Sequence, residues 1–421
     1  MTSPAVSERS GPLQATIVVP GSKSATARGY VLAALADAPS VLTGVLDARD
    51  TRLMRAALAS LGVGFTELGD DRVRVEPPER FRATDVEVGL AGTIMRFLPP
   101  VAALAHGPSR FDGDPEARLR PVAPLLDGLA QAGVRIAHPQ ALPFTVHGTG
   151  AVPGGRVTID ASGSSQFVSG LLLAGARFDA GLDLSHAGGT LPSRPHIGLT
   201  VAMLRDRGVR ISSEEGEDRW RVAPGPIAAR DEAIEPDLIN AVTFLAAPLL
   251  AGGEVTTAWP RHTVQAADTI LGVLAALGGD VRRSPGSVTV SGDGVVRGAD
   301  LDLSLASELT CIAAALLAVA DAPGRIRGVA HVRGHETDRL AALQAEINAL
   351  GGRVEQTPDG LRITPVPLRG GVFHTYADHR MAHAGALLGL AVGGVRLDDV
   401  TCTTKTLPDF PGLWATLVGR G

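Results

Sequence analysis

Two lysines stand out among the residues whose chemistry could serve a ligand. The chain has 39 lysine and arginine side chains, and only Lys23 and Lys405 are lysines. A lysine ammonium is a compact charge on a flexible stem, and the planar arginine fork does not replace it at every site. We therefore expect both lysines to bind small phosphorylated anions in a cleft between two halves of the protein. Chance retention is the alternative.

A second group of candidate ligand-binding residues lies at the starts of six segments that are almost wholly apolar. Buried helix N-termini leave amide donors free and carry a partial positive charge, so they attract anions. Serine, threonine and aspartate are also ordinary helix caps, which is the alternative for any single segment. A cap does not explain Lys23, Arg28, Gln166 or Arg380. The six openings are Gly21-Ser22-Lys23-Ser24, Gly92-Thr93, Ser164-Ser165-Gln166, Pro236-Asp237, Ser307-Glu308 and Asp378-His379-Arg380.

Further cations and acids lie in three polar segments. Arg120 precedes a predicted helix, Glu336 and Arg339 flank the start of another, and Lys405 lies in a polar loop. The Glu336–Arg339 spacing is also that of a solvated surface ion pair, which remains the alternative to a catalytic role. The segment around Lys23 lacks the Gly-x4-Gly-Lys spacing of a P-loop, which disfavours a nucleotide triphosphatase.

The elements that must position these residues form an internal repeat of about 70 residues. Each copy has an amphipathic helix with apolar residues at three- and four-residue spacing, ended by glycine. The first five copies continue with two short strands split by a turn. Each also has a second helix that is apolar all round and must be buried. The buried helices are expected near 24–36, 92–105, 165–177, 237–251, 307–320 and 379–392.

Six copies divide into three and three, so we predict two domains. The first domain comprises 21–234, and the second comprises 1–20 with 235–421; the chain crosses near 20–21 and 224–236. A long solenoid is the alternative, but its repeats are usually 20 to 50 residues. The first domain carries 23–28, Gly92, Arg120, 164–166 and Ser193, and the second carries Glu308, 335–339, Arg380 and Lys405.

Composition excludes several classes of protein. The net charge is −5, so bulk attraction to nucleic acid or an acidic membrane is not expected. Cys311 and Cys402 lie far apart and have no metal-binding spacing. The first 12 residues have no apolar core of the kind found in signal peptides, and no uncharged run is long enough to span a bilayer. We expect a cytoplasmic protein without disulfides.

The ordered motifs resemble those of the EPSP synthase family of enolpyruvyl transferases from residue 20 to 411. The resemblance implies an α/β fold of two inverted, barrel-like domains, each of three βαββαβ repeats with buried helices. The motifs are Pro20-Gly21-Ser22-Lys23-Ser24, Leu90-Ala91-Gly92-Thr93 with Arg96, Arg120-Pro121, Ser164-Ser165-Gln166-Phe167, His335-Glu336-Thr337-Asp338-Arg339-Leu340, Asp378-His379-Arg380-Met381 and Lys405-Thr406-Leu407-Pro408-Asp409.

The resemblance also implies an activity. Members transfer the enolpyruvyl group of phosphoenolpyruvate to the 5-hydroxyl of shikimate 3-phosphate and release phosphate, by addition and then elimination. This chemistry needs a base, an acid and cations for two phosphates and two carboxylates, with neither a metal nor an organic cofactor. We expect these two small molecules as the partners of a monomer.

Site residues follow from the motifs. Glu308 is implied as the base for the hydroxyl, Glu336 as the group that supplies or relays the other proton, and Lys23 as a third catalytic residue. The residues implied to bind shikimate 3-phosphate are Lys23, Ser24, Arg28, Ser164, Ser165, Gln166, Ser193, Glu308 and His335. Those implied to bind phosphoenolpyruvate are Lys23, Gly92, Arg120, Gln166, Arg339, Arg380 and Lys405.

Some positions depart from the family pattern. Glu308 stands where many members have Asp, which keeps the base and lengthens its reach. His335 replaces a common Lys, His331 a common Asn and His196 a common Tyr, so the charge at these positions follows the environment of each histidine. Phe97 stands where many members have Pro, next to the expected phosphoenolpyruvate site.

Two rival functions are weighed against this one. UDP-N-acetylglucosamine enolpyruvyl transferases are similar in fold but usually carry a reactive cysteine on the loop that corresponds to 106–119, where this chain has none. A binding module that kept the fold and lost the chemistry is the other rival. The intact set of Glu308, Glu336, Lys23 and Arg120 disfavours it.

Overall fold

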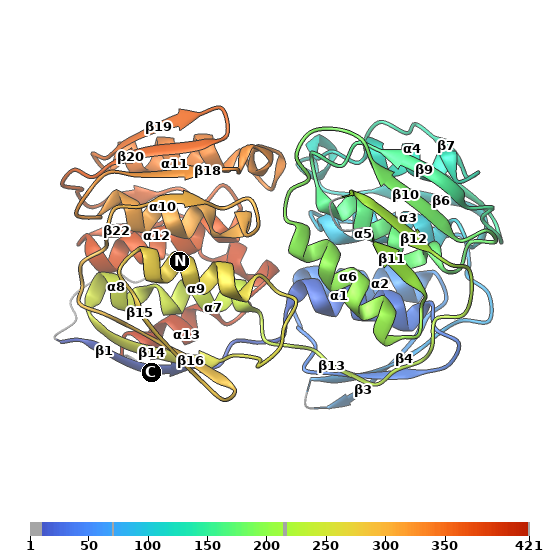
Figure 1. The fold of residues 1–421 in the computed structure, drawn as a ribbon, viewed down its shortest axis with the longest axis horizontal. Helices are drawn as coiled ribbons and strands as arrows, with labels where there is room; N and C mark the ends of the chain where they lie inside the picture. The colour runs from blue at the N-terminus through green and yellow to red at the C-terminus, as the bar shows by residue number, and fades with distance from the viewer. Residues whose placement is uncertain (1–10, 70, 214–216, 420–421) are drawn as a thin grey trace. The chain divides into compact units, whose positions relative to one another are not determined.

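The chain divides into two compact units (Figure 1). A computed structural model describes residues 11–69, 71–213 and 217–419. The N-unit is Gly21–Glu235, and the C-unit comprises the residues up to Pro20 and from Pro236 onward. Most of the first 12 residues, in which no signal peptide is expected, lie outside the described residues. None of the helices in the described ranges combines the length and apolarity needed to cross a membrane.

The N-unit contains three copies of one arrangement of strands and helices. The three four-stranded sheets have the strand orders β13-β2-β4-β3, β5-β6-β8-β7 and β11-β12-β10-β9. In chain order the elements are α1 (Lys23–Ala34), β2 (Ser40–Thr43), α2 (Arg49–Ser60), β3 (Gly64–Gly69), β4 (Arg72–Glu76), β5 (Val86–Glu87), α3 (Gly92–Ala102), β6 (His106–Asp112), η1 (Ala117–Leu119), α4 (Ala123–Gln131), β7 (Arg135–Ala137), β8 (Phe144–Thr149), β9 (Gly155–Ile159), α5 (Ser165–Gly175), β10 (Leu182–His186), α6 (Arg194–Asp206), β11 (Ile211–Ser213), β12 (Arg219–Val222) and β13 (Glu232–Ala233).

The C-unit repeats the arrangement with a shortened third copy. Its described sheets have the orders β1-β14-β16-β15, β17-β18-β20-β19 and β21-β22. Strand β1 pairs in parallel with β14, with Leu13 opposite Gly253. The elements are β1 (Leu13–Ile17), α7 (Leu238–Leu245), α8 (Ala247–Ala251), β14 (Gly253–Ala258), α9 (Ala267–Ala276), β15 (Asp280–Ser284), β16 (Ser287–Gly292), β17 (Asp300–Asp302), η2 (Ser307–Leu309), α10 (Thr310–Ala318), β18 (Gly324–Arg327), η3 (Ala330–Gly334), α11 (Arg339–Ala349), β19 (Arg353–Thr357), β20 (Gly360–Thr364), β21 (Gly371–Phe373), α12 (His379–Ala391), β22 (Val395–Leu397), η4 (Thr401–Lys405) and α13 (Phe410–Leu417).

The order of elements within a copy corrects the sequence prediction. The predicted unit was βαββαβ, but the second copy runs β5-α3-β6-α4-β7-β8, which is βαβαββ. Strands β5 and β6 are parallel and need a crossover helix, whereas β7 and β8 are antiparallel and follow one another without a helix between them. The α/β class is confirmed. The predicted strand pairs of the first five copies are antiparallel pairs in the described chain.

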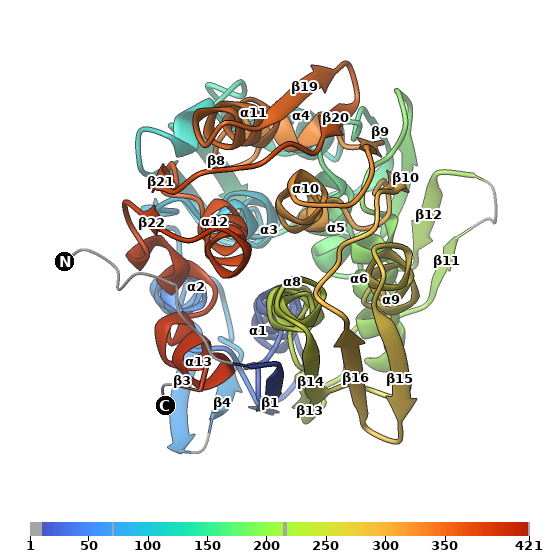
Figure 2. The same cartoon turned by 90° about the vertical axis from the view of Figure 1, so that its left-hand side faces the viewer.

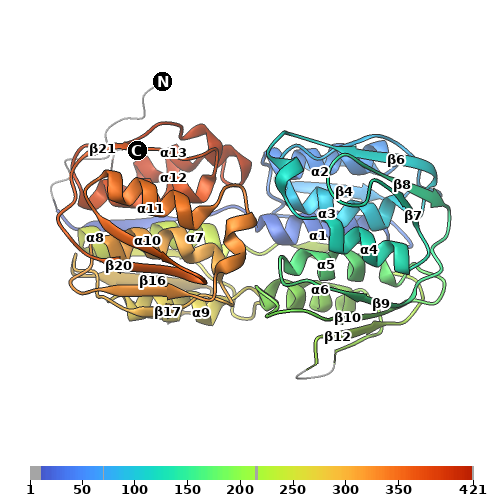
Figure 3. The same ribbon diagram turned by 90° about the horizontal axis from the view of Figure 1, so that it is seen from above.

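The apolar helices lie inside each unit, as predicted. Helices α1, α3 and α5 are buried along nearly their whole length in the N-unit (Figure 3). Helices α10 and α12 are the equivalents in the C-unit, where the sheets lie outside them (Figure 2). Close packing explains Gly170 on α5, since a Cβ there would lie 2.1 Å from the carbonyl oxygen of Arg96 on α3. Each unit has its own hydrophobic core.

The fourth buried helix differs from the prediction because it is divided. Helix α7 ends at Leu245 and α8 begins at Ala247. Pro248 has no N–H to donate to the carbonyl of Phe244, four residues earlier, so the hydrogen-bond ladder is interrupted there. The fifth buried helix opens with the 3-10 turn η2, which carries Glu308.

Candidate active site

In the N-unit, three buried helices begin with the residues that the sequence singled out. Helix α1 starts at Lys23 and is capped by Ser22, whose Oγ accepts a hydrogen bond from the Ala25 amide at 3.3 Å. Helix α5 starts at Ser165, and the Oγ of Ser164 accepts from the Gln166 amide at 3.2 Å. These serines are ordinary caps, as the alternative proposed. Their hydroxyl hydrogens can still donate to a ligand.

Helix α3 starts at Gly92 without a side-chain cap, and two guanidinium groups crowd its first turn. A Cβ on Gly92 would lie 2.8 Å from Nη1 of Arg96 and 3.0 Å from Nη2 of Arg120. Arg120 is 8% exposed and donates from Nη1 to the Leu90 carbonyl at 2.9 Å, while its buried Nε has no partner among the described residues. Two like charges at the positive end of a helix create a strong site for an anion.

Arg96 is fixed by its own contacts and orients a second predicted residue. Its Nη2 donates to the Pro121 carbonyl at 2.9 Å, and its Nη1 donates to Oε1 of Gln166 at 2.9 Å. The guanidinium also lies over the Phe167 ring, 5.3 Å from its centroid. Gln166 is thereby held with its oxygen toward Arg96, so its amide nitrogen is the end that can serve a substrate.

Arg28 lies deeper than its predicted role requires. It is 1% exposed and donates to Thr200, the Ser24 carbonyl, Ser169 and the His196 carbonyl at 2.7 to 3.2 Å. Burial lowers the pKa of Arg28 to about 9, so it stays charged at neutral pH. Because these four hydrogen bonds use most of its N–H groups, little of the fork remains for a carboxylate.

Two further N-unit residues flank these helices. Lys23 donates to Oδ2 of Asp50 at 3.2 Å, and the Asp50 side chain is 3% exposed. Sequence reasoning missed Asp50, which reads as an ordinary acid in the first turn of an amphipathic helix. Ser193 is buried and has a φ of 48°, a left-handed conformation that is unfavourable for serine. Strain of this kind is typical of functional sites.

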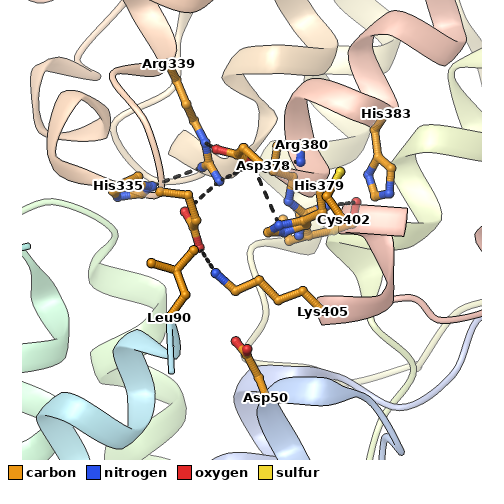
Figure 4. Close-up of polar contacts among 12 residues, drawn as sticks. Asp50, Leu90, His335, Arg339, Asp378, His379, Arg380, His383, Cys402 and Lys405 are labelled. Atoms are coloured by element: carbon orange, nitrogen blue, oxygen red, sulfur yellow. Dashed lines mark hydrogen bonds and ion pairs between the residues drawn. The ribbon is translucent and has the colours of Figure 1, made fainter. Parts of the chain in front are cut away.

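The C-unit gathers Glu336, Lys405 and Arg339. Figure 4 shows Lys405 and Arg339 with the neighbouring side chains of His335 and Asp378. Oε1 of Glu336 accepts from Nζ of Lys405 at 2.5 Å, and Oε2 accepts from Nη2 of Arg339 at 3.0 Å. The side chains of Lys405 and Arg339 are 4% and 3% exposed, and that of Glu336 is 8% exposed. Asp338 caps α11 by accepting from the amides of Leu340 and Ala341, which fixes the turn that carries Glu336.

Arg339 is bound mainly by protein groups. Its Nε and Nη2 donate to Asp378, and its Nη1 donates to Nδ1 of His335 at 3.0 Å. Burial alone would lower the pKa of Arg339, but Asp378 and Glu336 outweigh it and raise the pKa. Arginine can only donate, so Nδ1 of His335 is the acceptor of this hydrogen bond.

Arg380 offers the more open fork. It is 6% exposed, and its Nη1 donates to Oδ1 of Asn240 at 3.1 Å and weakly to the Ile239 carbonyl. No group in the described ranges bonds its Nε–Nη2 edge. Burial lowers the pKa of Arg380, while Asp237 opposes the shift. A buried guanidinium with an open edge is suited to a carboxylate ligand, which can accept two parallel hydrogen bonds.

Glu308 is half-buried on η2, beside a pair of histidines. Nε2 of His331 lies 2.9 Å from Oγ of Ser307. The rings of His331 and His335 lie edge to face, with their centroids 5.8 Å apart. Burial lowers the pKa of His331, and the charge of Glu308 opposes this shift. His331 is therefore neutral near pH 7. Glu308 and Glu336 both lie in the electrostatic reach of Arg339 or Arg380.

Cys311 and Cys402 are unpaired, and burial raises the pKa of each to about 12. In the described part of the chain, no three histidine, cysteine or carboxylate side chains come together as metal ligands would.

Known proteins resemble the chain over nearly its whole length. Residues 7–414 match the model of a family described as EPSP synthase (3-phosphoshikimate 1-carboxyvinyltransferase). The chain is 53% identical over 429 residues to the 3-phosphoshikimate 1-carboxyvinyltransferase of Kocuria rhizophila, and the match covers 99% of this chain and 96% of the relative. Two solved structures of EPSP synthase from Acinetobacter baumannii share the fold, with TM-scores of 0.80 and 0.79, 20% identity and 97% of each chain covered.

Proposed function

The chain belongs to the EPSP synthase family, and we propose that it transfers the enolpyruvyl group of phosphoenolpyruvate to the 5-hydroxyl of shikimate 3-phosphate. The observation that carries the proposal is the pair of guanidiniums packed against Gly92 at the start of α3. A buried positive cluster of this kind favours a small, highly charged anion. Phosphate is the leaving group of the reaction.

For shikimate 3-phosphate we propose a hydroxyl-rich site in the N-unit. Ser164 and Ser165 at the start of α5 and Ser193 before α6 would donate to its phosphate, and Gln166, whose amide nitrogen faces away from Arg96, directly follows Ser165. Ser24 would bind the carboxylate. Arg28 would add long-range charge and one N–H at most, because its other donors bind protein groups.

For the phosphate of phosphoenolpyruvate we propose Lys23, Arg120 and the Gly92 amide from the N-unit, and Lys405 from the C-unit. The carboxylate would bind chiefly to the open edge of Arg380. Arg339 would contribute a single donor, since Asp378 occupies its Nε–Nη2 edge. The motifs implied both arginines as ligands of phosphoenolpyruvate without ranking them.

We further propose that Glu308 accepts the proton of the 5-hydroxyl as its oxygen bonds to C2 of phosphoenolpyruvate. His335 would contact shikimate 3-phosphate through its Nε2–H. Glu336 would deliver a proton to the methylene carbon, through the Lys405 ammonium that it contacts. In the second step a proton returns from the new methyl group to the Lys405–Glu336 pair, phosphate departs with the proton that Glu308 accepted, and the double bond is restored. The cations around Glu336 stabilise the charge that develops on the intermediate.

One assay tests the function. Phosphate release should require phosphoenolpyruvate and shikimate 3-phosphate together, and each substrate alone should give none. Release with UDP-N-acetylglucosamine as the acceptor would assign the chain to the related transferase instead, and no release with either acceptor would favour a silent binding module. We also propose that the enzyme is a cytoplasmic monomer. Light scattering at the concentration of the assay tests the oligomeric state.

A further inference from the structure

Asn240 is a wholly buried polar residue that the motifs do not include. It is the third residue of α7, and its backbone N–H donates to Oδ1 of the cap residue Asp237 at 2.9 Å. The cap fixes the first turn of the helix and hence the direction of the Asn240 side chain. A buried carboxamide needs partners for both of its ends.

Its two ends bind two different segments that carry proposed substrate ligands. Oδ1 accepts from Nη1 of Arg380 on α12 at 3.1 Å, and Nδ2 donates to the carbonyl of Thr406 at 3.2 Å. Arginine can only donate and a carbonyl can only accept, so the orientation of the amide is fixed by its partners. Thr406 directly follows Lys405, which ends η4.

We propose that Asn240 is a positioning residue that holds Arg380 and the segment of Lys405 in one arrangement, so that the carboxylate and the phosphate of phosphoenolpyruvate bind together. This inference rests on the proposed function. Asn240 binds Arg380 through Nη1 and leaves the Nε–Nη2 edge open for the substrate. It also anchors the main chain next to Lys405 without using the ammonium.

The amide chemistry is needed at this position. A carboxylate would keep the bond from Arg380 but could not donate to Thr406, and its charge would compete with the substrate for the guanidinium. A leucine of similar size would lose both bonds and leave the Thr406 carbonyl without this donor. These differences make Asn240→Asp and Asn240→Leu complementary tests.

Asn348 offers a matched control in the same unit. It is an exposed asparagine on α11 whose amide also bridges main-chain groups, donating to the Val354 carbonyl at 3.0 Å and accepting from the Val354 amide at 2.7 Å. It contacts none of the proposed substrate ligands in the hydrogen bonds described. Asn348→Asp therefore makes the same chemical change away from the site.

Steady-state kinetics provide the first readout. Both Asn240 variants should raise the KM for phosphoenolpyruvate by roughly tenfold. In Asn240→Leu the hydrogen bond from the charged Arg380 is lost. Asn240→Asp should have the larger effect, because the new carboxylate competes with the substrate for Arg380. The KM for shikimate 3-phosphate should change less than about twofold, as it should for both substrates in Asn348→Asp. Equal effects of Asp and Leu on both substrates, or an unchanged KM for phosphoenolpyruvate, would overturn the proposal.

Hydrogen exchange of the peptide that covers 401–409 provides a readout without substrate. Both Asn240 variants should exchange faster there than the wild type, whereas Asn348→Asp should match the wild type in this peptide. Unchanged exchange in folded Asn240→Leu would refute the anchoring role even if activity fell. An inactive wild type would refute the proposed function, and the exchange data would still decide whether Asn240 holds the segment.

Discussion

Arg339 donates two nearly parallel hydrogen bonds to Asp378, from Nε to Oδ2 at 2.7 Å and from Nη2 to Oδ1 at 3.1 Å. Both side chains are buried, and Asp378 also caps α12 by accepting from the Arg380 amide at 2.8 Å. One carboxylate therefore ties the start of α11 to the start of α12. Removing it would leave a buried cation with less compensating charge, and such losses are strongly destabilising.

Asp378→Asn should lower the free energy of unfolding by about 3 to 5 kcal/mol, measured by urea denaturation. The matched control is Asp268→Asn, which removes the acid from the Arg283 ion pair; Asp268 is 91% exposed. An exposed pair contributes about 0 to 1 kcal/mol, so this variant should unfold almost like the wild type. Similar stabilities for the two variants would contradict the structural role of Asp378.

Replacing either lysine by arginine keeps the charge and changes the shape. Lys405 is 4% exposed beside Glu336, and a planar guanidinium cannot take the same compact position. Lys405→Arg and Lys23→Arg should each lower kcat by about a hundredfold, the scale found when an electrostatic stabiliser is lost. Arg283→Lys on the surface is the control. Near-normal turnover in either lysine variant would show that its ammonium was retained by chance.

The sequence predicted the buried helices well because their signal is local. An apolar run opened by Ser, Asp or Gly defines such a helix without reference to distant residues, and α1, α3 and α5 begin within about one residue of the expected positions. The division of α7 from α8 was missed, although Pro248 was a visible reason for it. The order of strands and helices within a copy was also wrong, because the sequence does not show which strands pair in parallel and therefore need a crossover helix between them.

The sequence prediction named candidate site residues but not the partners that hold them in the fold. Asp378 lies 39 positions from Arg339 and Asn240 lies 140 positions from Arg380, so neither bond has a local signature. For the same reason the motifs could not show that Arg28 and Arg339 use most of their N–H donors in hydrogen bonds to protein groups. Which arginine has an open edge is a property of the packed structure. This open edge favours Arg380 over Arg339 as the proposed ligand of the substrate carboxylate.

A methyl group at Gly92 should disturb phosphoenolpyruvate selectively. In Gly92→Ala the new Cβ would meet Nη1 of Arg96 at 2.8 Å and Nη2 of Arg120 at 3.0 Å. The ends of these flexible side chains can shift, so the fold should persist while the anion site opens. The KM for phosphoenolpyruvate should rise roughly tenfold, since a charged contact is weakened. Gly272→Ala on α9 is the control, because nothing lies within 4 Å of its added Cβ. Equal kinetics for the two alanine variants would contradict the crowding at α3.

His383 should make folding less stable as the pH falls. It is fully buried, and burial, reinforced by the charges of Arg380 and Arg339, holds its pKa well below the ordinary value. Above about pH 6.5 the ring is neutral in both states, so its contribution is complete. Below that pH the unfolded chain binds a proton that the folded protein resists, and the free energy of unfolding decreases. His383→Asn should therefore flatten the fall in stability between pH 7 and 5, whatever its effect on the absolute stability at pH 7.

His374 is the control of opposite sign: its hydrogen bond to Asp398 raises its pKa, so its contribution is present at low pH and lost as the pH rises. Parallel stability curves for His383→Asn and the wild type would show that His383 titrates normally in the folded protein.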